Sequence, residues 1–307
     1  MKKNSELVID DKTINLTHVD KILFPENNIS KGDLIEYYQK IAKTMLPYVE
    51  DHPVMMQRFL QGIQGEGFYQ KDAGDYFPEW VERVPIKKLE GGHNNFVVVK
   101  NAATLAYLAE QDCITLHAWL SRVDRPNDPD MLIFDLDPSD SGFEQVRQAA
   151  IALHNILSEV GISPLIKTTG SRGLHVIVRL DRSADFEHSR SFAQNIAILV
   201  VKQNSEHLTI EQRKDKRKGR VFIDTMRNNY GQTAVAAYSV RALPGAPIAA
   251  PLDWEELKNP RINPQSFTIQ NIFRRLSVKG DPWQKSWRQT TSLDGPNKKL
   301  SRYKSIG

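Results

Sequence analysis

The sequence contains one cysteine, no long hydrophobic run and no zinc or P-loop motif. Because Cys113 has no second cysteine to pair with, no disulfide forms within the chain and a reducing compartment is expected. The longest apolar run covers six residues, 196–201, far short of the roughly 20 that a membrane-spanning helix needs. The eight histidines show no zinc-binding spacing. We therefore expect a cytoplasmic protein without a structural zinc site.

The rest of the composition is that of a globular protein. Hydrophobic residues form 40% of the 307-residue chain and charged residues 25%, which suffices for a full core without disulfides. Apolar periodicity predicts strands at 131–136, 164–168 and 174–180, and helices at 142–160 and 186–201. Residues from 282 onward are expected at the periphery. Strands and helices mix without strict alternation, which favours an α+β fold over a doubly wound sheet.

The net charge of +4 is unevenly distributed. Residues 213–220 hold six basic residues and one acidic residue, and the segment 295–307 holds four basic residues and no acidic one. Such clusters are typical of a surface that binds a polyanion. The alternative is a solvated loop and a frayed tail.

Asp135 lies near the end of the predicted strand at 131–136, and Asp137 follows that strand directly. Alternate residues of a strand project from the same face, so both carboxylates share one side of the sheet. Neighbouring carboxylates at the end of a buried strand repel each other, and a divalent cation would relieve that repulsion. Asp224 ends a second strand-like run and could complete a two-metal site. The alternative for the first pair is a turn rich in Asp and Pro, and for Asp224 an ordinary strand end.

The loop at 168–175 joins two predicted strands and is rich in glycine and polar residues. Its backbone N–H groups could approach phosphate oxygens, and Arg172 and His175 could add charge-assisted hydrogen bonds. The alternative is a plain hairpin with a solvent-facing arginine. Phe68 and Tyr69 follow another glycine-rich loop and could stack on bases. Adjacent aromatics are also often half core and half surface.

Five segments follow one another in an order that is specific although each is weak by itself. They are THVDKILFPENNISKGDLIEYY, QRFLQGIQGEGFYQKD, MLIFDLDP, KTTGSRGLHVIV and GRVFIDTMRNNYGQTAVAAYSVRALPGAPIAAPLDWEEL. Together they resemble the polymerase domain of bacterial ATP-dependent DNA ligase D, of the archaeo-eukaryotic primase superfamily. The resemblance covers most of the chain, residues 10–290. No ligase or phosphoesterase segment accompanies it, so a stand-alone or excised polymerase domain is expected.

The resemblance implies a primase-polymerase-type core, with mixed and antiparallel sheets flanked by helices. It implies a nucleotidyltransferase that fills and extends broken DNA ends in non-homologous end joining and prefers ribonucleotides. Two Mn²⁺ or Mg²⁺ ions would serve NTP or dNTP substrates. The metal ligands and catalytic residues it assigns are Asp135, Asp137 and Asp224, the first two bridging both ions and the third holding the ion that faces the primer.

The resemblance also assigns binding roles. The residues for nucleotide binding are Thr169, Ser171, Arg172, His175, Arg227 and Arg241. The family often has serine at the position of Thr169, whose hydroxyl would meet a ribose 2′-OH. The residues for DNA are Lys21 and Lys31 at a downstream 5′-phosphate, and Phe68 and Tyr69 on the template. Lys31 stands at a predicted helix start, opened by a capping box at residues 30–33, whose free N–H groups would favour the phosphate.

These implications define the organisation that we expect. Residues 1–294 would form one primase-polymerase-like domain, with the N-terminal segment packed on the catalytic core, and residues 295–307 a basic tail. The expected partners are gapped or overhanging DNA ends with a 5′-phosphate, together with Ku and an ATP-dependent ligase, in a cytoplasmic, nucleoid-associated setting. The alternatives are a primase that needs no primer and a non-catalytic module that bridges DNA ends.

Overall fold

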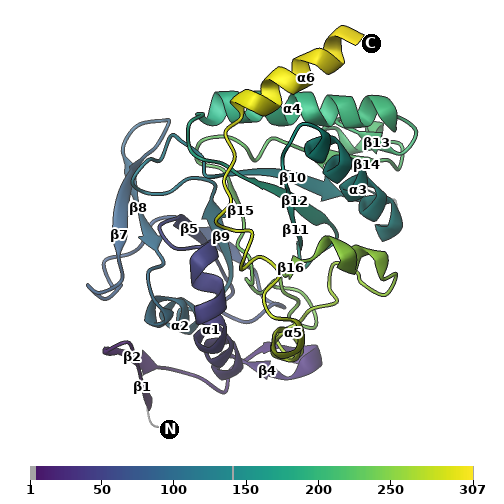
Figure 1. The fold of residues 1–307 in the computed structure, drawn as a ribbon. Helices are drawn as coiled ribbons and strands as arrows, with labels where there is room; N and C mark the ends of the chain where they lie inside the picture. Colours follow the sequence, from purple (N-terminus) through teal and green to yellow (C-terminus); the bar gives the residue numbers. More distant parts are fainter. Residues whose placement is uncertain (1–4, 140–141, 307) are drawn as a thin grey trace. The chain divides into compact units, whose positions relative to one another are not determined.

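The computed structural model describes residues 5–139 and 142–306, the last five of these by their backbone alone. Contacts divide the chain into two compact units, each built from three stretches of sequence. Unit 1 comprises Met1–Trp119, Thr233–Ala249 and Phe267–Val278, and unit 2 comprises Leu120–Gln232, Ala250–Ser266 and Lys279–Gly307. Figure 1 shows the elements of both units along the chain.

Unit 1 is built around an antiparallel sheet of strand order β15-β9-β5-β8-β7, with β6 added to β5. Its elements are β1 (Ser5–Ile9), β2 (Lys12–Leu16), β3 (Ile22–Phe24), β4 (Ile29–Ser30), α1 (Lys31–Met45), β5 (Pro53–Arg58), β6 (Phe68–Gln70), β7 (Arg83–Lys87), β8 (His93–Val98), α2 (Ala102–Glu110), β9 (Cys113–Trp119), β15 (Thr233–Val235) and α5 (Ile272–Lys279). The predicted capping box is confirmed, because Ser30 Oγ accepts from Asp33 N at 3.2 Å while the Asp33 carboxylate accepts from Ser30 N at 2.7 Å. Helix α1 then buries Leu34, Ile41 and other apolar residues, and packs against α2.

Unit 2 carries a six-stranded sheet of order β13-β14-β10-β12-β11-β16. Its elements are β10 (Met131–Asp137), α3 (Phe143–Glu159), β11 (Leu165–Thr168), β12 (Leu174–Arg179), α4 (Phe186–Gln203), β13 (Leu208–Thr209), β14 (Val221–Asp224), β16 (Pro251–Leu252) and α6 (Asp294–Ile306). Helices α3 and α4 lie side by side against this sheet (Figure 1). Every pairing is antiparallel except β13 with β14, so the expected α+β class with mixed and antiparallel sheets is confirmed.

The segment 283–293 carries buried residues, so the expectation that everything from residue 282 onward is peripheral was wrong for this part. Trp283 is buried and its indole N–H donates to Ile166 O at 3.1 Å. The Trp287 ring stacks on Trp283 and receives the guanidinium of Arg179 at 4.0 Å. The average hydrophobicity of this segment is low, but its two large aromatic rings bury much apolar surface in the core.

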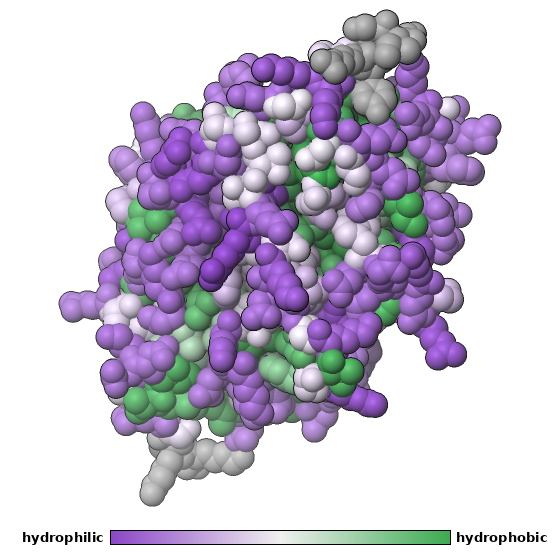
Figure 2. Space-filling view, viewed as in Figure 1, coloured by the Kyte–Doolittle hydropathy of each residue, from purple (hydrophilic) through white to green (hydrophobic). Residues whose placement is uncertain are grey.

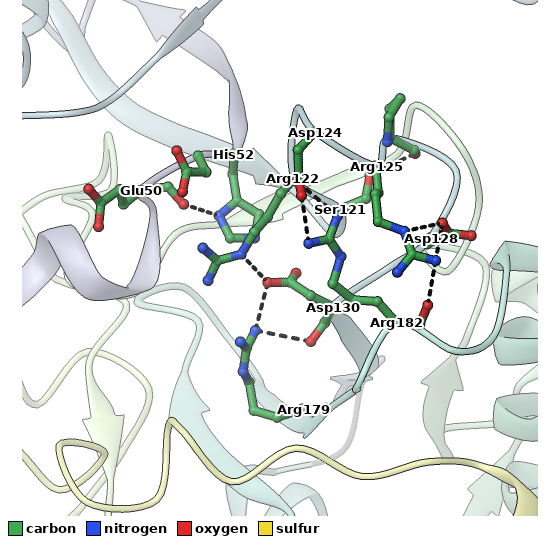
Figure 3. A network of polar contacts seen from close by, with 12 residues as sticks. Glu50, His52, Ser121, Arg122, Asp124, Arg125, Asp128, Asp130, Arg179 and Arg182 are labelled. Atoms are coloured by element: carbon green, nitrogen blue, oxygen red, sulfur yellow. Dashed lines mark hydrogen bonds and ion pairs between the residues drawn. The ribbon is translucent and has the colours of Figure 1, made fainter.

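A buried ion network fixes the start of β10. Asp130 is 1% exposed and its Oδ2 accepts from Arg122 Nε at 2.9 Å and from Arg179 Nη1 at 3.0 Å (Figure 3). Arg179 also donates to Asp130 O at 3.0 Å. This network joins the ends of β10 and β12, on which the polar residues described below are placed.

Figure 2 shows a face that is mostly hydrophilic, with small hydrophobic areas scattered over it. No helix in the described ranges 5–139 and 142–306 is long and apolar enough to cross a membrane.

Candidate active site

Three carboxylates share one face of the unit 2 sheet. Asp135 and Asp137 alternate on β10, as their spacing predicted, and the register places Asp224 of β14 directly opposite Asp135. Cross-strand partners in an antiparallel pair project to the same side. All three aspartates are partly buried, next to strand residues that are fully buried. The neighbouring strands thus bring Asp224 to two carboxylates that lie 87 and 89 residues before it in the chain.

Asp135 is held by two nitrogen groups. Its Oδ2 accepts from Arg227 Nε at 2.7 Å, and its Oδ1 lies 3.4 Å from His175 Nε2. Burial acts to raise the pKa of Asp135, yet His175 and the Arg227 guanidinium together hold that pKa well below its ordinary value. Asp135 is therefore a carboxylate at neutral pH.

The other two carboxylates have different surroundings. Asp137 Oδ1 lies 3.5 Å from Arg172 Nη2, and Asp137 Oδ2 lies 3.5 Å from Arg217 Nη1. Asp224 Oδ1 accepts from Met226 N at 2.7 Å. Burial, and then the negative charge of Asp135, raise the pKa of Asp224 above its ordinary value. A nearby cation would therefore stabilise Asp224 in its charged form.

The donor chemistry of these residues fits a divalent cation, although their side chains are turned towards arginines. Mg²⁺ and Mn²⁺ prefer carboxylate oxygens, and the three aspartates present them on one face. In the part of the chain that the structure describes, no three Asp, Glu, His or Cys side chains form a group that could hold a metal ion. A cation on Asp135 and Asp137 would have to compete with Arg227, Arg172 and Arg217.

His175 and Lys167 continue the polar row across the sheet. The register sets His175 of β12 opposite Asp135 on one side and opposite Lys167 of β11 on the other. His175 is 3% exposed and Lys167 is 2% exposed. Burial, and then the charge of Lys167, lower the pKa of His175 to about 4, although Asp135 opposes this. His175 is therefore an uncharged ring at neutral pH, and the permanent cation on Asp135 is Arg227.

Lys167 and Arg217 were missed by the sequence reasoning. Lys167 is a single lysine in an apolar strand, and its only signal is the two-residue spacing to Thr169. Arg217 lies within the basic segment 213–220, and the sequence does not distinguish it from the other basic residues there. Unlike them it is buried, with its guanidinium 3.9 Å from the centre of the Phe222 ring.

The predicted glycine-rich loop is closed by the hydroxyl of Thr169. Thr169 Oγ1 accepts from Ser171 N at 3.2 Å and from Gly173 N at 3.1 Å, and donates to Gly173 O at 3.1 Å. Gly170 has φ +66°, and a Cβ on Gly173 would lie 1.9 Å from Leu136 O, so both positions require glycine. The N–H groups of Ser171 and Gly173 thus already donate to Thr169, and an approach of this loop's N–H groups to phosphate oxygens stays a prediction.

Arg241 and the aromatic pair belong to unit 1. Arg241 follows β15, and its place among the nucleotide-binding residues stays a prediction. Phe68 and Tyr69 are 41% and 56% exposed, so neither is a core residue. They project from opposite sides of β6: Phe68 covers the Arg58 guanidinium, and Tyr69 lies edge-on to His117 at 5.7 Å. Their template-stacking role also stays a prediction.

Lys21 and Lys31 converge, as expected for a phosphate site, but each is paired with an acidic residue. Lys21 Nζ lies 2.5 Å from Asp112 Oδ1, and Lys31 Nζ lies 2.9 Å from Glu110 Oε1. The prediction of free N–H groups at the start of α1 was wrong. Lys31 N donates to Lys21 O and Gly32 N to Val19 O, both at 2.8 Å, and Asp33 N donates to the capping serine.

The sequence and the fold match known proteins over most of the chain. Residues 30–283 match the family described as LigD, primase-polymerase domain. The chain belongs to the LigD primase-polymerase domain family. Since this family consists of nucleotidyltransferases of the primase-polymerase type, the chain is an enzyme of that class.

The relatives and the solved structure agree with this family. The chain is 27% identical over 280 residues to the multifunctional non-homologous end joining DNA repair protein LigD of Mycobacterium tuberculosis, covering 88% of this chain and 36% of that protein. It is 29% identical over 272 residues to the bifunctional protein LigD of Bacillus subtilis, covering 88% and 43%. The polymerase domain of Mycobacterium tuberculosis ligase D, solved with DNA, superposes with a TM-score of 0.85 at 26% identity, covering 91% of this chain and 99% of that one. The chain thus spans less than half the length of these curated LigD relatives, and nearly all of the solved domain.

Proposed function

We propose that this protein is a template-directed polymerase that fills and extends broken DNA ends in non-homologous end joining. The observation that carries the proposal is the common face of Asp135, Asp137 and Asp224, with His175 in the next strand. A protein that only binds DNA gains nothing from clustered carboxylates, which repel the phosphate backbone. The names of the LigD relatives and the DNA in the solved domain support the same role.

Asp135, Asp137 and Asp224 would hold the divalent cations, Mn²⁺ or Mg²⁺. Bound there, the cations supply Lewis acidity to the primer 3′-hydroxyl and to the triphosphate. Arg172 and Arg227 would then be released from the carboxylates and could neutralise the charge that develops on the phosphates. Neutral His175 would offer its ring as a hydrogen-bond partner without adding a permanent charge.

We extend the proposal to a preference for ribonucleotides and to a DNA end with a 5′-phosphate. The resemblance to ligase D supports the sugar preference, and the convergence of Lys21 and Lys31 supports the phosphate. Ku and an ATP-dependent ligase are the proposed protein partners, because the relatives are named as end-joining proteins.

The deciding experiment measures primer extension on a gapped template with Mn²⁺ or Mg²⁺ and each of the four NTPs and dNTPs. Asp135→Ala, Asp137→Ala and Asp224→Ala should each lower extension by more than about 100-fold, because even residues behind metal ligands cost 10- to 100-fold. DNA binding should persist or tighten slightly, since a negative charge is removed. Asp294→Ala, which removes an exposed carboxylate of unit 2, is the matched control. Wild-type extension by any of the three variants would refute the site.

The same assay separates the alternatives. Product on a single-stranded template without a primer would show a primase. Absence of incorporation by the wild type under every metal and nucleotide tested would leave a non-catalytic bridging module.

A further inference from the structure

The two lysines of the proposed 5′-phosphate site surround one carboxylate oxygen. Asp112 Oδ1 lies 2.5 Å from Lys21 Nζ and 4.0 Å from Lys31 Nζ. Both ammonium groups therefore converge on a single oxyanion, as they would on a phosphate oxygen. With Glu110 on the other side of Lys31, two cations face two anions, and this cluster carries no net charge.

The two carboxylates of this cluster differ in how firmly they are held. Glu110 is 4% exposed, and its Oε1 accepts from Lys31 Nζ at 2.9 Å, from Thr17 N at 3.1 Å and from Thr17 Oγ1 at 2.7 Å. Its second oxygen accepts from Gln111 Nε2 at 2.8 Å. A buried ammonium with a buried, multiply bonded carboxylate is a fixed pair whose separation is costly. We therefore expect Glu110 to position Lys31 and to stay paired with it when a phosphate binds.

The Asp112 carboxylate, by contrast, is placed where another anion can replace it at the lysines. It lies in the turn between α2 and β9 with φ +60°, and its backbone carbonyl accepts from Phe59 N at 3.0 Å. Its side chain meets Lys21, which at 27% side-chain exposure is the accessible member of the cluster. The Asp112 side chain is only 12% exposed, but its partner Lys21 is open to solvent. An anion that arrives from solvent can therefore reach this pair, and it displaces the carboxylate if it binds the lysines more strongly.

We propose that Asp112 is a built-in competitor for the 5′-phosphate: its carboxylate occupies the lysine pair until a terminal phosphate displaces it. This inference rests on the proposed function. A terminal phosphate near neutral pH carries up to two negative charges and three acceptor oxygens, whereas an aspartate or an internal phosphodiester carries one charge. Asp112 thus limits use of the pocket by continuous DNA, which offers only monoanionic phosphates, and leaves it to DNA ends.

The test measures the affinity of the full chain for gapped duplexes that differ only in a 5′-phosphate or a 5′-hydroxyl at the gap. Asp112→Asn removes the charge, and asparagine tolerates the left-handed backbone of this turn. Affinity for the 5′-phosphate duplex should rise roughly two- to fivefold, the equivalent of one partly exposed ion pair. Affinity for the 5′-hydroxyl duplex should change far less. Asp112→Gly, which also suits φ +60°, should behave alike if the asparagine variant folds poorly.

Asp51→Asn is the matched control. Asp51 also has a positive φ, +66°, lies in unit 1 and pairs with Lys100, so the same charge is lost from the same conformation elsewhere. It should leave the ratio of the two affinities at the wild-type value. Lys21→Ala combined with Asp112→Asn should abolish the gain, because the released ammonium is then missing.

The outcomes separate this inference from the proposed function. The decisive quantity is the affinity for the 5′-phosphate duplex divided by the affinity for the 5′-hydroxyl duplex. If this ratio in Asp112→Asn is equal to or below that of the wild type, Asp112 is not a competitor for the phosphate, whether or not the protein extends primers. A raised ratio that requires Lys21 supports this inference. Primer extension in the same samples tests the polymerase independently, since its absence in the wild type refutes the proposed function and leaves the binding ratios to report on the pocket.

Discussion

At the scale of single residues, the Thr169 hydroxyl decides how the glycine-rich loop at 168–175 is built. A hydroxyl has one donor and two acceptor positions, and Thr169 Oγ1 uses them on Gly173 O, Ser171 N and Gly173 N. In this loop conformation nothing is left for a ribose 2′-OH. The sugar contact implied by the resemblance therefore requires one of these loop bonds to break.

Substitutions of Thr169 separate a loop role from a sugar role. Thr169→Val leaves two N–H groups without their acceptor, at about 1–3 kcal/mol each when buried. We expect it to raise the KM for NTPs and dNTPs by similar factors, whereas Thr169→Ser keeps the hydroxyl and behaves as wild type. Steady-state incorporation with matched NTP and dNTP pairs checks this. A loss confined to ribonucleotides in the valine variant would instead establish the 2′-OH contact.

At the scale of elements, the Asp130 network holds the ends of β10 and β12 in place. Asp130→Asn keeps the shape but leaves Arg179, which is 7% exposed, without its counter-charge. Removing one partner of a buried pair costs about 3–5 kcal/mol. We expect urea unfolding to show a loss of that order. Asp128→Asn, which breaks the exposed pair with Arg125 (Figure 3), should cost about 1 kcal/mol or less. Equal losses in the two variants would contradict the role of the network.

The buried thiol of Cys113 can be used to detect unfolding of strand β9. Cys113 is 1% exposed, its thiol lies 3.5 Å from Thr115 O, and burial raises its pKa to about 12. At pH 8 only about one thiol in 10⁴ is ionised, so a thiol reagent should modify Cys113 in denaturant but hardly at all in the native protein. Because the folded pKa exceeds its ordinary value of 9.0, this group's contribution to stability falls as pH rises from about 9 towards 12. Rapid native modification with an unchanged circular dichroism spectrum would contradict the burial.

The elements could be predicted where their pattern is apolar and periodic. Strands β10 and β12 and helices α3 and α4 agree with the sequence prediction within one or two residues at each end. Strands β7 and β8 were missed because polar residues form much of both. The carboxylate pair on β10 follows from strand alternation, but its meeting with Asp224, His175 and Lys167 depends on register, which no local pattern encodes. The acidic partners of Lys21 and Lys31 lie 79 or more residues away in the chain, so spacing could not reveal them.

At the scale of the whole molecule, the +4 charge is concentrated in the basic segment 213–220 and the tail. Within residues 213–220 the side chains of Lys214, Lys216 and Lys218 are exposed, whereas Arg217 is buried against Phe222. The segment therefore combines an anchored arginine with lysines that are free to meet a phosphate backbone. Each phosphate that a lysine neutralises releases counterions, so affinity for duplex DNA falls with salt in proportion to the number of phosphates bound.

The last prediction concerns these three lysines. Replacing Lys214, Lys216 and Lys218 by alanine should weaken duplex binding and reduce the slope of log affinity against log salt by about 0.9 for each phosphate that is no longer neutralised. The fold and the extension rate at saturating DNA should be unchanged, because all three side chains are exposed. A control variant with alanine at Lys40, Lys258 and Lys279 removes the same charge from lysines that are paired with glutamates. If the segment binds DNA, its variant shows a smaller slope and the control does not. Equal slopes in the two variants would mean that the segment contributes only net charge to DNA binding.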